Sequence, residues 1–407
     1  MSMKSDEARY SRDNDRYQVG VDTQVTARPR GVRDVLCVLS VVALVAAGCG
    51  TEPRGACNPE PPAGTVGSIC GFANPEDVEV IAPAGLLLVS QMRRGSTGGS
   101  IAALPLRGTQ QQRAVVRRLW PVGDRARDVA SVTDAGDPSC TEPPSPEAFS
   151  PHGISSVATK TPGLVRLAVV AHGVREAVEL FDLVGVGDAA TLSWRGCVPL
   201  PPSTVGNDVS IGADAELVVS DYMPAMTGWF GLYYTLASGL GSNTGDVMTW
   251  RSQSGWRRLP GTAAPAPNGV LVSPDGTGVF YAETGSGLVR RVPRGGTTDA
   301  GREPHVTIGG NPDNLSLGPR GSLLAVTHTD GAAFMLCAFG RLPCRTGWSL
   351  FEIDPGGLNA SLLLHHDGSV IGAVASAAEF DGRVYFGSVF DDRIGVWQRS
   401  PATDPRE

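Results

Sequence analysis

The sequence predicts an all-β protein that folds as a six-bladed β-propeller, on the evidence of a repeat and of the composition. A loose pattern recurs along the chain: a polar residue, alternating apolar residues, a turn that contains glycine, and a second apolar run. Its six copies begin at Glu76, His152, Asn207, Asn268, Asp313 and Ala375. A spacing of roughly 45–75 residues suits the four-stranded blade of a propeller. The composition agrees, because 52 glycines and 31 prolines suit many short strands joined by turns.

The first 48 residues have the features of a secretory leader. A polar segment ends in the basic residues Arg28, Arg30 and Arg33, and an apolar run extends from Val35 to Ala47. A basic region followed by a short apolar run is typical of a signal peptide, and a run of this length is too short to span a bilayer. We therefore expect residues 1–48 to be a leader and the protein to be exported.

The cysteine at position 49 predicts a lipid anchor. It follows Ala46-Ala47-Gly48, which resembles the lipobox of bacterial lipoproteins, although the commonest form has leucine where this chain has Ala46. The alternative is an ordinary signal peptide followed by an unrelated cysteine. With Cys49 lipidated, residues 49–69 would form a tether and residues 70–400 the propeller domain. The protein would then be a bacterial outer-membrane lipoprotein, and the alternative location for the exported protein is the periplasm or the cell surface.

The remaining six cysteines predict disulfide bonds, because their number is even and the chain is expected to be exported. The plausible local pairs are Cys57 with Cys70, Cys140 with Cys197, and Cys337 with Cys344. Six cysteines allow fifteen connectivities, so other pairings stay open. The sequence has no C-x-x-C pair, which disfavours structural zinc.

The polar residues at the start of the repeats are expected to converge. In a propeller the innermost strand of each blade lines the central channel, and these strands all begin at the same end. The residues at this position are Glu76, Asp77, His152, Asn207, Asp208, Asn268, Asp313 and Asn314. The alternative is that such residues only mark strand starts and turns, as they often do. That explanation suits one copy better than it suits five.

A cluster of carboxylates and side-chain amides predicts calcium. Ca²⁺ takes about six to eight oxygen ligands in loose geometry, whereas zinc prefers histidine or cysteine in a tetrahedral array. Adjacent residues on a strand point in opposite directions. The doublets Glu76-Asp77 and Asn207-Asp208 therefore predict two calcium ions, one at the channel and one deeper in the fold.

Two histidines are predicted to lie side by side near this cluster. His152 precedes one alternating run and His172 closes the next, and the turn Thr161-Pro162-Gly163 joins the two runs. Both histidines would therefore lie at the same end of adjacent strands. Imidazoles titrate near neutral pH and are common general bases. The alternative is that both are ordinary structural histidines.

These motifs together resemble the paraoxonase-type arylesterases and lactonases, within the wider set of six-bladed calcium propellers that includes gluconolactonases. The matching stretches read E-D-V-E-V-I at Glu76, S-P-H-G-I-S at Ser150, N-D-V at Asn207, P-N-G-V-L-V-S-P-D-G at Pro267 and D-N-L-S-L at Asp313. The resemblance extends in order over nearly the whole chain after the leader.

The resemblance implies a role for each matching residue. The catalytic-calcium ligands would be Glu76, Asn207, Asn268, Asp313 and Asn314. The structural calcium would be bound by Asp77, Asp208 and the backbone carbonyl of Ile154. His152 would activate water with His172 as its partner, and His328 would line the substrate pocket.

The chain also departs from the animal members of that family. Tyr222 replaces a histidine at the pocket rim, which puts the substrate range in doubt. The final strand, expected at 393–397, has no cysteine with which to close the ring by a disulfide bond. The apolar stretch from Trp229 to Tyr234 matches the family's variable loop over the site, and its alternative is an ordinary packed strand.

The function predicted from these features is calcium-dependent hydrolysis of small-molecule lactones and aryl esters. The sequence has no nucleophile elbow of the form G-x-S-x-G, which disfavours a serine mechanism. Glu76 is an alternative base to His152. One rival is a non-catalytic surface propeller that binds a protein or glycan partner and keeps calcium for stability. A second rival is a strictosidine-type propeller enzyme, but such an enzyme would lack the calcium cluster. A net charge of −7 without a basic patch gives no sign of nucleic-acid binding.

Overall fold

The computed structural model describes residues 55–95, 98–122, 135–224, 228–297, 303–338, 340 and 344–399. The predicted leader and Cys49 lie outside these ranges, so export and lipidation stay predictions. Within the described ranges, no helix has both the length and the apolar character needed to cross a membrane.

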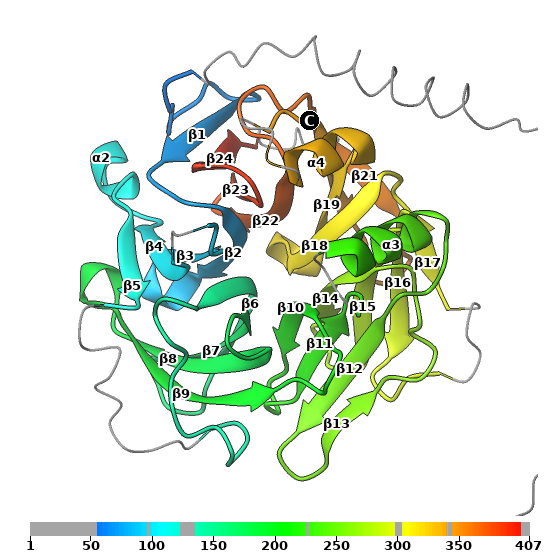
Figure 1. Ribbon diagram of the computed structural model, residues 1–407. Helices are drawn as coiled ribbons and strands as arrows, with labels where there is room; N and C mark the ends of the chain where they lie inside the picture. The colour runs from blue at the N-terminus through cyan, green and yellow to red at the C-terminus, as the bar shows by residue number, and fades with distance from the viewer. Residues whose placement is uncertain are drawn as a thin grey trace, which may run out of the picture. The chain divides into compact units, whose positions relative to one another are not determined.

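Six antiparallel sheets of four strands each are arranged in a ring, which confirms the predicted six-bladed β-propeller (Figure 1). The first blade contains β2 (Pro75–Ile81), β3 (Leu86–Gln91), β4 (Ser100–Pro105) and β5 (Arg117–Trp120). The second contains β6 (Ser150–Ala158), β7 (Leu164–His172), β8 (Ala177–Val184) and β9 (Thr191–Pro199). The third contains β10 (Gly206–Ile211), β11 (Leu217–Asp221), β12 (Asp246–Arg251) and β13 (Gly255–Arg258).

The other three blades complete the ring. The fourth contains β14 (Pro267–Val272), β15 (Gly278–Glu283), β16 (Leu288–Pro293) and β17 (His305–Thr307). The fifth contains β18 (Asn311–Leu317), β19 (Leu323–His328), β20 (Trp348–Ile353) and β21 (Ala360–His366). The sixth contains β22 (Val374–Phe380), β23 (Arg383–Ser388), β24 (Arg393–Gln398) and β1 (Val66–Cys70). The innermost strands β2, β6, β10, β14, β18 and β22 each contact the next, and β22 contacts β2.

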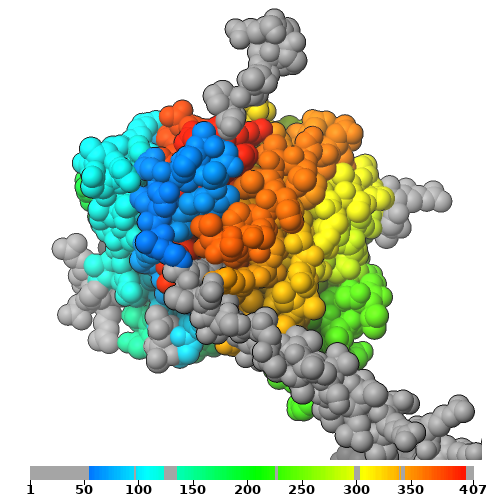
Figure 2. Space-filling model, turned by 90° about the horizontal axis from the view of Figure 1, so that it is seen from above, coloured from blue at the N-terminus to red at the C-terminus, as the bar shows by residue number. Residues whose placement is uncertain are grey.

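The ring is closed by the N-terminal strand. β1 pairs antiparallel with β24, from Val66 opposite Trp397 to Cys70 opposite Arg393, and Figure 2 shows the blue N-terminal segment against the red and orange C-terminal blade. The tether predicted for residues 49–69 therefore includes most of a strand of the ring. Backbone pairing closes the ring here, without a cysteine in the final strand.

The blades pack face to face, so their middle strands are buried on both sides. In β3, Leu86 and Leu88 belong to the core shared with the second blade. Leu87 and Val89 belong to the core shared with the sixth blade. Successive side chains of a strand point to opposite faces. A strand covered on both faces is therefore a continuous apolar run rather than an alternating one.

Short helices occur in the connections. The α-helices are α2 (Gln110–Arg113), α3 (Gly228–Gly239) and α4 (Gly331–Ala338), and the 3-10 turns are η1 (Ala82–Ala84), η3 (Gly187–Ala189) and η4 (Pro319–Gly321). The alternative of a packed strand at Trp229 to Tyr234 is wrong, because this stretch lies within α3. The sheet of that blade is already complete, and the side chains of Trp229 and Phe230 are 86% and 72% exposed.

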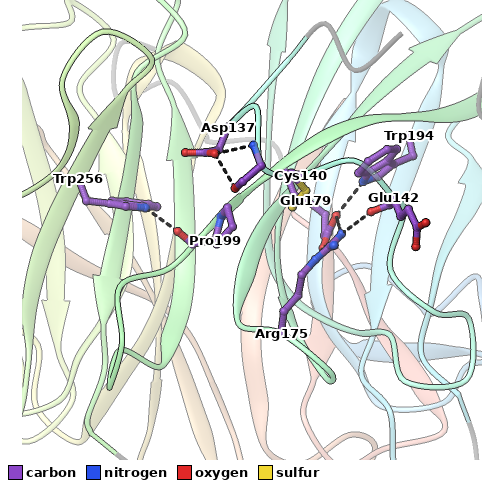
Figure 3. The surroundings of a disulfide bond; sticks show 10 residues. Asp137, Cys140, Glu142, Arg175, Glu179, Trp194, Pro199 and Trp256 are labelled. Carbon is purple, nitrogen blue, oxygen red and sulfur yellow. Dashed lines mark hydrogen bonds and ion pairs between the residues drawn. A yellow bond between two sulfur atoms is a disulfide. The ribbon is translucent and has the colours of Figure 1, made fainter. Parts of the chain in front are cut away.

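The three predicted local disulfide bonds are all present: Cys57–Cys70, Cys140–Cys197 and Cys337–Cys344. Figure 3 shows the second of them, which ties the segment before β6 to β9, the outer strand of the same blade. This bond ties the chain that leads into β6 to the outer strand of the blade that carries the two histidines.

Candidate active site

A β-bulge lies near the start of every innermost strand, and the predicted calcium ligands and His152 lie in or beside these bulges. The register shifts fall between Pro75 and Asp77, Pro151 and Ile154, Gly206 and Val209, Pro267 and Val270, Pro312 and Leu315, and Val374 and Ser376. Bulges change the direction of side chains and are common beside active sites. The expectation that the polar residues precede their strands is corrected, because each lies just inside its strand.

Four buried side-chain oxygen atoms on these bulged innermost strands have no hydrogen-bond partner in the described part of the chain. They come from four different blades and are Glu76 Oε2, Asn207 Oδ1, Asn268 Oδ1 and Asn314 Oδ1. Buried polar atoms are rarely left unpaired, so four at one level call for an explanation. With Asp313, they are the five residues that the family resemblance assigns to the catalytic calcium.

The donor set fits calcium better than it fits a transition metal. The described residues contain no group of three or more His, Cys, Asp and Glu side chains arranged to bind a metal. Three of the five donors in this set are amides, which together with carboxylates suit Ca²⁺. Glu76 and Asn314 are in contact, because Asn314 Nδ2 donates to Glu76 Oε1 at 2.8 Å.

The carboxylates of the cluster repel one another in a buried setting. Burial, followed by the charges of Asp77, Asp313 and Asp208, raises the pKa of Glu76 well above its usual range. Burial and then the charge of Asp77 do the same to the pKa of Asp208. Burial raises the pKa of Asp77 to about 7. A divalent cation among these groups would relieve both the repulsion and the cost of burying their charges.

Asp77 and Asp208 differ from the other members, because their oxygens are already hydrogen-bonded. Asp77 accepts from the backbone N–H groups of Val78 at 2.8 Å and Ile154 at 2.7 Å. Asp208 accepts from those of Val209 at 2.7 Å and Val270 at 2.8 Å. Each therefore joins the innermost strand of its own blade to that of the next.

Two glycines allow the innermost strands to approach this closely. A Cβ atom at Gly153, directly after His152, would lie 2.4 Å from Asp208 Oδ1. A Cβ atom at Gly269, directly after Asn268, would lie 2.6 Å from the backbone oxygen of Asp313. The glycines that follow His152 and Asn268 in the sequence are therefore part of the construction of the site.

His152 and His172 lie side by side, as their positions on adjacent strands predict. His152 Nδ1 is 2.9 Å from His172 Nε2, and His152 Nε2 is 3.6 Å from Glu76 Oε1. That second distance is too long for a hydrogen bond. Burial, followed by the charge of His172, lowers the pKa of His152 well below its usual value. The lowered pKa favours the neutral form of His152, which is the form that a general base requires.

Sequence reasoning missed Glu176, whose carboxylate contacts the histidine pair. His172 Nδ1 lies 2.7 Å from Glu176 Oε2, in the hairpin that joins β7 to β8. The sequence signal was available, because the glutamate follows His172 by four residues.

His328, Tyr222 and Asp313 form the opposite side of the cluster. His328 Nε2 lies 2.8 Å from Asp313 Oδ2. Burial, followed by the charge of Asp313, raises the pKa of Tyr222 above its usual value. The ring of His328 lies 4.3 Å from that of Phe334 on α4. Sequence reasoning did not place a helix or Phe334 at this wall.

Comparison with known proteins gives similarity of fold alone. No protein-family model matches the chain, and no curated protein matches it. A gluconolactonase from Xanthomonas campestris is 14% identical, with 86% of this chain and 99% of that one covered and a TM-score of 0.48. The calcium-binding protein regucalcin from Agrobacterium tumefaciens is 12% identical, with 82% and 95% covered and a TM-score of 0.44.

A third similar structure is the PQQ-bound form of an aldose sugar dehydrogenase from Streptomyces coelicolor. It is 14% identical, with 84% of this chain and 99% of that one covered and a TM-score of 0.45. A fold by itself does not determine a function, which has to be argued from the site.

Proposed function

We propose that the protein is a calcium-dependent hydrolase of lactones and aryl esters. The observation that supports this most directly is the set of four buried oxygens without a partner among the described residues, beside a hydrogen-bonded histidine pair. A bound calcium ion would polarise the carbonyl of the substrate and stabilise negative charge on its oxygen. Glu76, Asn207, Asn268, Asp313 and Asn314 would hold this ion.

The histidine pair supplies the base. His152 Nε2 faces the cation ligands and has no hydrogen bond to Glu76, so it can take a proton from water. His172 holds the ring of His152 through its other nitrogen. A second calcium ion at Asp77, Asp208 and the carbonyl of Ile154 would support the innermost strands. Lactones are the preferred substrates in this proposal, because the ring holds the carbonyl and needs little reorganisation on attack.

The test is hydrolysis of phenyl acetate and a panel of small lactones, with excess calcium and with a chelator. The wild-type protein should turn over lactones with calcium and lose this activity with the chelator. His152→Gln should lower kcat by about 10²–10⁴-fold, while calcium binding measured by calorimetry stays intact. His365→Gln is the matched control, because His365 is exposed on the outer strand β21.

Two results would contradict parts of this proposal. Wild-type rates in His152→Gln would remove His152 as the base and leave Glu76 as the candidate. The absence of any turnover by the wild-type protein in excess calcium would favour the non-catalytic propeller that binds a partner.

A further inference from the structure

We propose that Glu176 is a positioning residue that sets the proton arrangement of the histidine pair, so that the free lone pair of His152 faces the cation site. This inference rests on the proposed function for its kinetic consequences, but the proton arrangement itself can be measured without any activity. Three hydrogen-bonding groups in a row carry the argument: Glu176, His172 and His152.

The arrangement starts from the carboxylate. Glu176 Oε2 is 2.7 Å from His172 Nδ1. An ionised carboxylate only accepts hydrogen bonds, so His172 Nδ1 must carry the hydrogen. In a neutral imidazole the other nitrogen is then an acceptor. His172 Nε2 therefore accepts.

The same logic passes to the second ring. His152 Nδ1 lies 2.9 Å from His172 Nε2, so His152 Nδ1 must donate. Neutral His152 then has its lone pair on Nε2, the nitrogen that lies 3.6 Å from Glu76 Oε1. Without a carboxylate at position 176, His172 could carry its hydrogen on Nε2 and donate to His152. In that case His152 Nε2 would be protonated and unable to accept a proton from water.

Glu176 also provides a place for the positive charge. When water gives its proton to His152 Nε2, the Nδ1 proton of His152 can pass to His172 Nε2. The charge then rests on His172 beside the Glu176 carboxylate. The side chains become more exposed along this row, from 7% for His152 to 14% for His172 and 36% for Glu176. The proton can therefore leave towards solvent at the outer end of the row.

The surroundings hold this hairpin in place. A Cβ atom at Gly173 would lie 2.3 Å from the backbone oxygen of Ala148, so the hairpin packs closely on the segment before β6. Arg175 donates to the buried Glu179 and to the backbone oxygen of Glu142 (Figure 3). His172 and Arg175 also line a cavity of about 660 Å³ on this side of the second blade, together with Glu142. Glu142 thus offers a carboxylate on the same wall as a control.

The direct test is the state of the histidine rings in long-range ¹H–¹⁵N spectra of the calcium-loaded, full-length protein. The chain has six histidines, and His152→Gln and His172→Gln would assign the two signals of interest. In the wild-type protein both rings should carry hydrogen on Nδ1. Glu176→Ala should give His172 a substantial population with hydrogen on Nε2. Glu176→Asp, which keeps the carboxylate, should restore much of the wild-type pattern.

Kinetics provide the second readout. Glu176→Ala should lower kcat for lactones by about 10- to 100-fold, part of the usual effect of a general base, with KM changed less than about twofold. Glu142→Gln, which removes a charge from the same cavity without touching His172, should leave both constants unchanged. Unaltered ring signals in Glu176→Ala would overturn the proposal, and so would equal losses in Glu176→Ala and Glu142→Gln. If the wild type hydrolyses nothing, the proposed function fails and the spectra still decide the role of Glu176.

Discussion

Single residues in the innermost strands divide into those whose side-chain oxygens already join two strands by hydrogen bonds and those whose side-chain oxygens have no partner in the described part of the chain. Asp208 uses both carboxylate oxygens on backbone N–H groups of two strands. Asn268, on the neighbouring strand, has a buried side-chain oxygen with no partner in the described part of the chain. The same substitution at these two positions should therefore have different consequences.

Asp208→Ala should lower the free energy of unfolding by about 2 kcal/mol in the presence of chelator, because two backbone N–H groups lose their acceptor. The relief of charge repulsion offsets part of that loss. Asn268→Ala should change it by less than about 0.5 kcal/mol under the same conditions. With calcium, Asn268→Ala should instead lose most lactone turnover. Thermal unfolding and kinetics check both, and equal destabilisation by the two variants would refute the division.

Structural elements show what the sequence could and could not predict. The innermost strands and the polar residues near their starts were predictable, because each copy of the repeat carries the same short local signal, whereas the bulges that hold those residues were not. Helix α3 was not, because its aromatic residues Trp229 to Tyr234 suit a strand by local propensity. The complete four-stranded sheet of that blade leaves them no place as a strand. β1 was missed because its partner, β24, lies more than 300 residues away and leaves no local signal.

The N-terminal strand depends on local restraints as well as on β24. Replacing both Cys57 and Cys70 with serine should lower the free energy of unfolding by about 2–3 kcal/mol, because this disulfide closes a loop of 13 residues. The double replacement of Cys337 and Cys344 is the control, and its smaller loop, with a separation of 7 residues, should matter less. Urea unfolding in excess calcium measures both. Identical midpoints for the two double variants would argue against a special role for the first disulfide.

For the whole molecule, calcium and pH should act together on stability. Burial raises the pKa of Asp77 to about 7, whereas an aspartate in an unfolded chain titrates near about 4. Between these values the calcium-free folded state holds a proton that the unfolded state has released. The stability of the calcium-free protein should therefore fall as the pH rises from about 4 to above about 7.

In the proposed function calcium would take the place of these protons, so its stabilising effect should be larger at higher pH. At a free concentration about 100-fold above Kd, each ion adds about 2.7 kcal/mol. The difference in Tm between calcium-loaded and chelated protein should be larger at about pH 8 than at about pH 5.5. Differential scanning calorimetry at both pH values tests this. A difference in Tm that does not change with pH would mean that the buried carboxylates do not bind the ion.

Because the first and last strands close the ring together, β1 must wait for its partner while the rest of the chain is synthesised. Cys70 of β1 lies opposite Arg393 of β24 in the ladder that closes the ring. A ribosome that adds about 5–20 residues per second needs tens of seconds to synthesise the chain between them. During this interval β1 exists without its partner, and an unpaired strand edge invites aggregation. One of its two edges is already occupied, because Ser68 N donates to the backbone oxygen of Asn58 at 2.9 Å. Prolines at 59, 61 and 62 flank that contact and cannot extend a ladder. Newly synthesised β1 therefore exposes mainly the edge that later pairs with β24.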